Sequence, residues 1–261
     1  ALMAAFVEEG GGSAKINDQK ARELRGIATK AAELLAKLER FDEAENILVR
    51  AGAFGRAAKL AYQTGAYERA AQLFLRVGRG DLAAKALARG GDAVAAARHM
   101  GEYLREKGDD AAAIGHLIKA GDHVSAAELC RKLGRFADSG EHYLRADQPA
   151  AAAEMFRAAD QPERAAEAYE AAGCFQEAAE CLAQNPDTQR RAALLEKAGR
   201  AFEAGQLWTQ SDRADEAIRV LQQIEPSHPR FAESCALLGQ LFRDKGMHSL
   251  SLKKLQEAAG G

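Results

Sequence analysis

Small and bulky apolar residues recur along the chain with a period of thirteen, most clearly in residues 52–77, GAFGRAAKLAYQT followed by GAYERAAQLFLRV. Each unit opens with Gly, here called position 0. Positions 5 and 6 hold a pair of Ala residues, such as Ala57 and Ala58, and positions 8 and 9 hold bulky residues, such as Leu73 and Phe74. A unit this short cannot bury its own apolar face, so the units must stack on one another.

The thirteen-residue register runs through most of the chain in two unbroken stretches. A four-residue insertion separates them and predicts that the helix around residues 93–107 is longer by about one turn. Position 0 is occupied by Glu39, Gly52, Gly65, Gly78, Gly91, Gly108, Gly121, Gly134, Asp147, Asp160, Gly173, Pro186, Gly199 and Asp212. So many starts in register indicate one elongated array.

Each unit predicts one helix of about nine or ten residues, roughly 14 Å long. Gly at position 0 allows the left-handed backbone that ends the preceding helix, while Asp or Pro there predicts a cap or turn residue. Basic residues favour the negative C-terminal end of a helix, and position 11 holds Arg50, Arg76, Arg89, Lys119, Lys132, Arg145 and Lys197. Because the turns are short, the units pair into antiparallel hairpins, which predicts an all-α, right-handed α-solenoid.

The two ends of the chain depart from this pattern. Residues 1–17 contain an amphipathic peptide, ALMAAFVEE, and a GGGS tether, so we hypothesise that residues 1–9 dock on the array as a fused partner peptide or an extra helix. Residues 18–38 predict a longer helix with Asp18 as N-cap. Its apolar residues at helical spacing are Leu24, Ile27, Ala31, Leu34, Leu35 and Leu38. The expected domains are therefore 1–17, a solenoid over 18–225, and a C-terminal hairpin over 226–261.

Composition supports a helical, soluble chain. Hydrophobic residues make up 47% and aromatic residues only 6%, and an Ala-rich sequence of this kind favours helix. The formal net charge of −2 gives no general attraction to nucleic acid or to anionic membranes. No apolar segment approaches the roughly 20 residues of a membrane span. We expect a cytoplasmic protein, bacterial by its use of Ala, Gly and Arg, and a fragment of a larger one.

Residues 226–261 resemble a tetratricopeptide repeat. The family's small, aromatic, turn and packing positions are matched by Leu238, Gly239, Phe242, Gly246, Leu255 and Ala258, while Cys235 and Ser251 depart from its usual residues. The thirteen-residue units are similar in style to the helical hairpins of vesicle-coat solenoids and soluble NSF attachment proteins. The tetratricopeptide resemblance implies a scaffold that binds peptides, helices or protein surfaces on a concave face, without catalysis.

If the last repeat sets the parity of the array, positions 7 and 10 of alternate helices line that concave face. The expected partner-binding residues are then Gln72, Arg98, Glu128, Arg131, Glu154, Arg157, Glu180 and Gln206. Position 7 is basic or neutral early in the chain, as at Lys59, Lys85 and Arg98, and then becomes a series of glutamates at 128, 141, 154, 167 and 180. This polarity either orients a charged partner, with a basic segment on the acidic half, or is a solvated face that keeps the chain soluble.

No sequence motif indicates an enzyme, a cofactor or a metal site. His99, His116 and His142 share position 8, but helices of one layer lie about 10 Å apart, so packed core histidines are the expectation. Cys130 and Cys181 fall at apolar positions and predict reduced core thiols. The alternatives left open are a nucleic-acid-binding helical repeat, which the net charge and the glutamates disfavour, and a non-catalytic structural spacer.

Overall fold

The computed structural model describes residues 13–260 and, within them, contains helices and no strand. The helices are α1 (Ser13–Lys37), α2 (Phe41–Arg50), α3 (Phe54–Gln63), α4 (Tyr67–Arg76), α5 (Gly80–Gly90), α6 (Ala93–Glu106), α7 (Asp110–Lys119), α8 (His123–Lys132), α9 (Phe136–Arg145), α10 (Pro149–Ala158), α11 (Pro162–Ala171), α12 (Phe175–Cys181), α13 (Thr188–Lys197), α14 (Ala201–Gln210), α15 (Ala214–Leu221), α16 (Phe231–Asp244) and α17 (His248–Gly260). The predicted all-α fold is confirmed, and α2 to α15 each correspond to one thirteen-residue unit.

Left-handed backbone at position 0 ends these helices. In every unit except the one that starts at Pro186, the residue at position 0 has a φ between 55° and 93°. Asp147, Asp160 and Asp212 adopt this conformation as the glycines do, so their predicted role as turn residues is confirmed. The proline ring fixes φ at a negative value, and at this start Asp187 caps α13 by accepting a hydrogen bond of 3.0 Å from the amide of Arg190.

Positions 5, 6 and 9 form the core. The Ala pairs are almost fully buried, for example Ala57 with Ala58 and Ala165 with Ala166. Position 9 is buried in every unit except at Met100, which is half-buried. Position 8 is less uniform, because its side chain is buried in some helices and half-buried in others. The small residues therefore bring neighbouring helices together, and position 9 fills the space between them.

The close approach is tightest where position 6 is Gly. A Cβ added to Gly140 in α9 would lie 2.5 Å from Cε1 of Phe156, which is position 9 of α10. A Cβ on Gly205 in α14 would lie 2.5 Å from Leu221, position 9 of α15. Position 6 of one helix thus faces position 9 of the next, whether the first helix is even-numbered or odd-numbered.

The hairpin of α16 and α17 has the same close contact between a Gly and a bulky residue of the next helix, but its helices are longer, with 14 and 13 residues. A Cβ on Gly239 would lie 2.7 Å from Leu255, and Gly246 turns the chain with a φ of 75°. The buried Ser251 hydroxyl donates to the carbonyl of Gly239 at 2.7 Å. In α9, Ser139 donates at 2.8 Å to Ala127, the residue twelve positions earlier, as Ser251 does. The thirteen-residue units are therefore a shortened form of the tetratricopeptide-like packing of the last hairpin.

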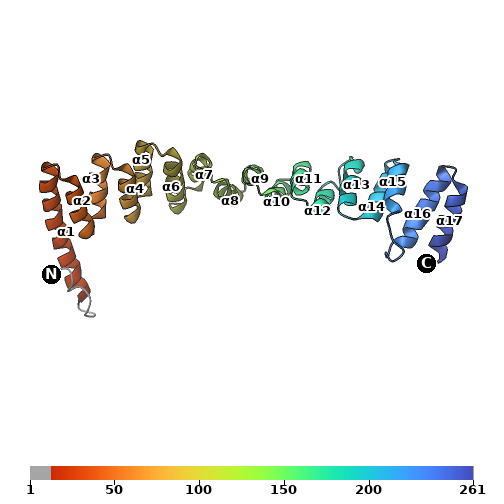
Figure 1. The fold of residues 1–261 in the computed structure, drawn as a ribbon, viewed down its shortest axis with the longest axis horizontal. Helices are drawn as coiled ribbons and strands as arrows, with labels where there is room; N and C mark the ends of the chain where they lie inside the picture. Colours follow the sequence, from red (N-terminus) through yellow and green to blue (C-terminus); the bar gives the residue numbers. More distant parts are fainter. Residues whose placement is uncertain (1–12, 261) are drawn as a thin grey trace. The chain divides into compact units, whose positions relative to one another are not determined.

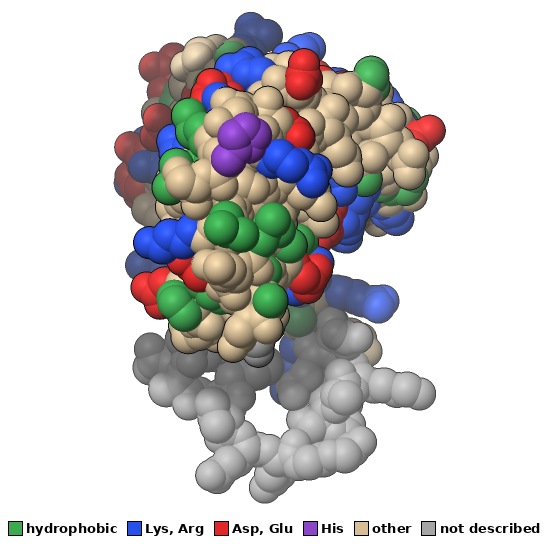
Figure 2. Space-filling model, turned by 90° about the vertical axis from the view of Figure 1, so that its right-hand side faces the viewer, with side chains coloured by type: hydrophobic (Ala, Val, Ile, Leu, Met, Phe, Trp, Pro, Cys, Tyr) green, Lys and Arg blue, Asp and Glu red, His purple; other side chains and the backbone are tan. Residues whose placement is uncertain are grey.

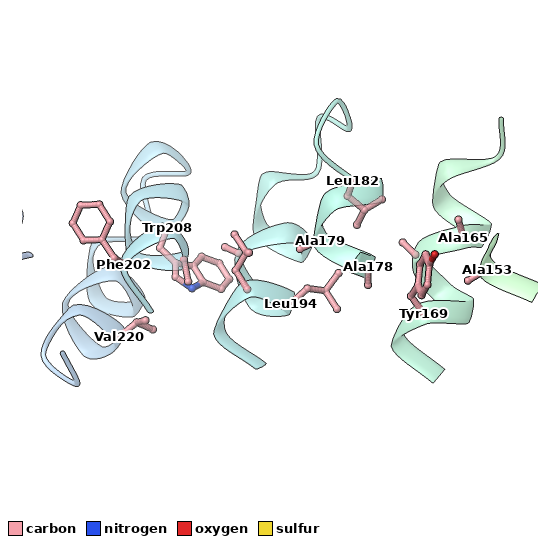
Figure 3. Packing of buried hydrophobic residues seen from close by; sticks show 14 of the residues in the cluster. Ala153, Ala165, Tyr169, Ala178, Ala179, Leu182, Leu194, Phe202, Trp208 and Val220 are labelled. Atoms are coloured by element: carbon pink, nitrogen blue, oxygen red, sulfur yellow. The ribbon is translucent and has the colours of Figure 1, made fainter. Parts of the chain in front are cut away.

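The chain divides into two compact units, Ala1–Ala126 (unit 1) and Ala127–Gly261 (unit 2). Within each unit, successive helices lie side by side in chain order (Figure 1). Unit 1 has an Ala-rich core that includes Leu48, Leu73 and Phe74. The core of unit 2 carries larger side chains, among them Tyr169, Leu194 and Trp208 (Figure 3).

Two helices lie outside the regular thirteen-residue pattern, α6 and α1. The insertion lengthens α6 to 14 residues, as expected, against 10 in α7. Helix α1 begins at Ser13, so the prediction that Asp18 is its N-cap is wrong. Of its apolar residues, Leu35 is half-buried, but Leu24, Ile27 and Leu34 are exposed, as is Leu38 directly after the helix. The hypothesis that residues 1–9 dock on the array lies outside the described residues.

Candidate functional site

Ion pairs between alternate helices join the odd-numbered helices of unit 2. Arg164 of α11 pairs with Glu141 of α9. Lys197 of α13 donates to Glu170 of α11 at 2.6 Å, and the two nitrogens of Arg219 in α15 hold Glu196 of α13 at 2.6 and 2.8 Å. We call this set, with Arg190 between Glu167 at 3.8 Å and Glu170 at 3.7 Å, the odd-helix ladder.

The ladder favours the ionised form of its partly buried carboxylates, Glu170 and Glu196. The hydrogen bond from Lys197 lowers the pKa of Glu170, and the hydrogen bond from Arg219 lowers the pKa of Glu196. Both carboxylates therefore stay ionised well into the acid range. Glu141 and Glu167, two members of the position 7 series, also form ion pairs with the next odd helix, so this part of the series joins helices to one another.

The even-numbered helices of unit 2 use position 7 differently. Glu154 of α10 accepts a hydrogen bond of 2.6 Å from Arg157, one turn along the same helix, and a second from the hydroxyl of Tyr169 in α11. Tyr169 is buried, and burial, followed by the bond to Glu154, raises its pKa, so the phenol stays protonated and donates. Glu180 of α12 accepts 3.0 Å from Gln176 of its own helix.

A hollow of about 330 Å³ opens beside these even-numbered helices, between α10 and α12. Its lining residues are Arg157, Asp160, Gln161, Pro162, Glu177, Glu180 and Cys181. The lining thus holds three carboxylates and one guanidinium, that of Arg157. Glu154, which is not part of the lining, forms an ion pair with this guanidinium and partly neutralises it. We call this region the acidic hollow. Its surplus of negative charge suits the ammonium or guanidinium group of an incoming side chain.

The half-buried thiol of Cys181 forms part of the wall of the acidic hollow. Burial is the main cause that raises its pKa, and it likewise raises the pKa of the buried Cys130. Raised pKa values keep both thiols protonated at neutral pH, and a protonated thiol is a poor nucleophile. Cys181 therefore contributes apolar surface to the hollow.

The structure places all eight expected partner-binding residues on exposed surface. It brings Arg157 and Glu180 together in the acidic hollow, and Arg157 also donates a hydrogen bond to Glu154. Gln72 and Arg98 belong to unit 1, and Gln206 lies in α14, outside the hollow. Glu128 and Arg131 lie on α8, the helix in which the two units meet in the sequence.

The sequence pattern missed Asp160 and Gln161 in the turn between α10 and α11 and Pro162 at the start of α11. It also missed Glu177 at position 4 of α12. Asp160 is a position 0 residue, so the repeat explained it fully as a turn. Only the position of α12 beside this turn makes Asp160 part of the lining of the acidic hollow.

A different hollow, of about 280 Å³, lies between α1 and α3 in unit 1. Its lining includes the apolar Ala32, Leu48 and Leu60, and its charged members are Arg56, Lys59 and Glu33, so basic residues are in the majority. Lys59 belongs to the basic part of the position 7 series. The two hollows thus differ in charge as the sequence series does.

The three histidines at position 8 do not share a site. His142 is buried, whereas His99 and His116 are half-buried, and Nδ1 of His99 lies 3.2 Å from Glu102 of its own helix. Across residues 13–260, no group of three or more His, Cys, Asp or Glu side chains is arranged to hold a metal ion. Nor is any helix in that range both long and apolar enough to cross a membrane.

Comparisons with known proteins give only distant likenesses. Neither a protein-family profile nor a curated protein matches the chain. The C-terminal part of a TPR repeat-containing protein from Cytophaga hutchinsonii is 16% identical, with 87% of this chain and 93% of that chain covered and a TM-score of 0.34.

MamA is 20% identical over 61% of this chain and 92% of its own, with a TM-score of 0.26. The TPR domain of P58(IPK) is 15% identical over 90% of this chain and 92% of its own, with a TM-score of 0.22. Scores this low do not establish a common arrangement. The tetratricopeptide-like character of the chain rests on the packing of α16 against α17 and of its shorter relatives.

Proposed function

We propose that the protein is an interaction scaffold that holds a basic segment of a partner protein along the even-numbered helices of unit 2. The observation that carries this proposal is the division of one glutamate series into two uses. Glu141 and Glu167 are tied to neighbouring odd helices, while Glu180 faces the acidic hollow together with Glu177 and Asp160.

The geometry favours a peptide or an exposed segment over a small molecule. The hollow is open at the surface, and its lining side chains come from α10, from α12 and from the turn between α10 and α11 with the first residue of α11. Carboxylates on a rigid helical frame recognise Lys or Arg by charge and by directed hydrogen bonds. One cationic side chain of the partner would enter the acidic hollow, and flanking residues would lie along α10 and α12.

Selection of random short peptides on the immobilised full chain tests this proposal. We expect the selected peptides to be enriched in Lys and Arg and to bind more weakly as salt is added, because exposed charges are screened. Replacing Glu177 and Glu180 by Gln should weaken a selected peptide about tenfold, equal to about 1.4 kcal/mol of binding free energy.

The matched control is the variant in which Glu141 and Glu167 are replaced by Gln. It removes the same charge from the same helical array, but from the odd-helix ladder, so the affinity for the peptide should stay within about twofold. Equal losses in both variants would point to a general effect of net charge. A chain that selects no peptide would favour the structural spacer.

A further inference from the structure

Helix α1 carries an apolar stripe that its own unit leaves uncovered. The exposed fractions are 52% for Leu24, 65% for Ile27 and 62% for Leu34, and the stripe continues to Leu38, 66% exposed, which directly follows the helix. The helix packs on α2 through another face, which includes the buried Ala28 and Ala32. The stripe is thus a second apolar face of α1, beside the one that holds it in unit 1.

The spacing of this stripe is that of a two-helix seam. With Ala31 in its middle, the intervals between successive members alternate between three and four residues over residues 24–38. That is the heptad spacing of positions that interlock between two paired helices. None of α2 to α15 is long enough to present such a seam, since the longest of them has 14 residues against 25 in α1.

We infer that the stripe is a docking surface for α1 of a second copy of this chain, with the two helices antiparallel. A twofold axis beside Ala31 would place Leu24 level with Leu38 of the second copy and would bring Ile27 within about one residue of the level of Leu34. The two Ala31 residues would then meet at the axis, where their small side chains allow the helices to approach closely. The same patch serves both copies, as a twofold interface requires.

The charges beside the stripe favour the antiparallel direction. Glu23, Lys30 and Lys37 are exposed and follow one another at intervals of seven along the side of the stripe that faces away from α2. An antiparallel pair places Glu23 opposite Lys37 at both ends, leaving one like-charge pair of Lys30 residues in the middle. A parallel pair would set each of these residues level with the same residue of the second chain, so all three levels would carry like charges.

The chain's own residues 1–9 are too short to cover the stripe. Even as a helix they would span roughly 14 Å, and the tether before Ser13 adds at most roughly 14 Å. Leu38 directly follows the last residue of α1 and lies 25 residues beyond Ser13, which is roughly 38 Å along the helix axis. Residues 1–9 could reach Leu24 and Ile27 but would leave Leu34 and Leu38 exposed.

The mass of the full chain in solution, measured by light scattering over a range of concentrations, tests the inference. We expect twice the mass of one chain, and a return to the mass of one chain when Ile27 and Leu34 are both replaced by Glu. The control is Leu252→Glu on α17, since Leu252 is 60% exposed at the end of the chain seen in Figure 2, where apolar side chains also gather. Far-ultraviolet circular dichroism should be the same for all three proteins.

Several outcomes would overturn the inference. One is a full chain that is monomeric at every concentration; if Phe6→Glu then made it dimeric, residues 1–9 would be the occupant of the stripe. Another is dissociation by Leu252→Glu as well, which would indicate a head-to-tail contact between α1 and α17.

Cysteine cross-linking tests the antiparallel direction separately. Ala31→Cys should link two copies under mild oxidation, because the axis passes beside this position. Leu24→Cys alone should not, whereas a mixture of Leu24→Cys and Leu38→Cys proteins should give the mixed dimer. The unsubstituted chain, with its four native cysteines, is the control, and efficient linking of Leu24→Cys to itself would contradict the antiparallel pair.

Discussion

At the scale of single residues, position 6 decides how closely two helices pack. Gly140 and Gly115 are both helical glycines, but only Gly140 meets a neighbouring side chain, whereas a Cβ on Gly115 would find nothing within 4 Å. The residue type alone does not distinguish them. Their difference follows from their positions in the unit, since Gly140 occupies position 6 and Gly115 position 7.

Gly140→Ala should therefore lower the free energy of unfolding by about 1–3 kcal/mol, because Phe156 must move to make room. Gly115→Ala should raise it by about 0.5–1 kcal/mol, because Ala favours helix over Gly. Urea denaturation followed by circular dichroism measures both. If the two substitutions had the same sign, the close contact of Gly140 with Phe156 would not be the reason that Gly is required there.

Position 0 illustrates the part of the fold that residue types determine well. The recurrence of Gly predicts left-handed turns, and these occur at each Gly start. The structure adds that Glu39 has the same conformation, with a φ of 58°, although Glu has no special preference for it. The repeat imposes the conformation on this residue, because the next helix must turn back to pack.

Gly134→Ala tests that imposed conformation without a steric clash, since nothing lies within 4 Å of the added Cβ and the φ of Gly134 is 74°. The expected loss is about 1–2 kcal/mol of unfolding free energy, which is the ordinary penalty for a left-handed residue other than Gly. Gly134→Asn should lose less than the Ala variant, because Asn tolerates this conformation. Equal losses would indicate a cause other than the backbone angle.

At the scale of helices, the odd-helix ladder explains why the position 7 series could not be interpreted from sequence alone. The glutamates at 141, 154, 167 and 180 are equivalent in a thirteen-residue register. A hairpin contains two units, so alternate members lie on different layers and meet different neighbours. The sequence identified the variable position correctly. Which of its carboxylates pair with the next odd helix and which lie beside the acidic hollow depends on how the helices pair.

The ladder also predicts how stability depends on pH. The pKa values of Glu170 and Glu196 are lower in the folded chain than in the unfolded chain, where a Glu titrates near ~4.3. Their contribution is thus fully present above that value and is lost as the pH falls through the lower, folded pKa values. We expect the thermal midpoint to be constant near neutral pH and to fall in the acid range below about pH 5.

Thermal unfolding of the full chain and of Glu196→Gln measures this contribution. The Gln variant should lose part of the acid dependence, because the group that titrates against Arg219 is gone. The control is Glu128→Gln on α8, which removes an exposed carboxylate outside the ladder. An unchanged pH profile in Glu196→Gln would mean that other carboxylates cause the acid loss.

At the scale of the whole molecule, the sequence predicted the helices from α2 to α17 closely, and it was least accurate at α1. The reason is physical: the thirteen-residue units repeat one set of contacts, so each unit supports the prediction for the next. Helix α1 has a neighbour in the array on one side only, and periodicity alone could not show which of its apolar residues face that neighbour. The domain boundaries expected at residues 17/18 and 225/226 stay predictions.

Because the same contact joins each helix to the next, we predict that two consecutive thirteen-residue repeats can be removed together. Deleting residues 147–172 takes out α10 and α11 and joins α9 to the left-handed Gly173. Position 6 of α9 then faces position 9 of α12, so the chain should stay folded, with helical circular dichroism reduced only in proportion to its length. Deleting residues 160–172 alone should reduce helicity further, because α12 would then take the place of α11 beside α9, and Glu177 would stand opposite Glu141 where Arg164 now pairs with it.

The same uniformity bears on how a gene for such a chain can change. An in-frame loss or gain of one hairpin produces a new array in which each junction has the same kind of contact, position 6 against position 9, as the junctions already present. No second mutation is then needed to accommodate the change. A change by a single helix has no such neutral outcome. Array length is therefore free to drift in steps of two units, and descendants of one ancestral gene can differ in length while each remains folded.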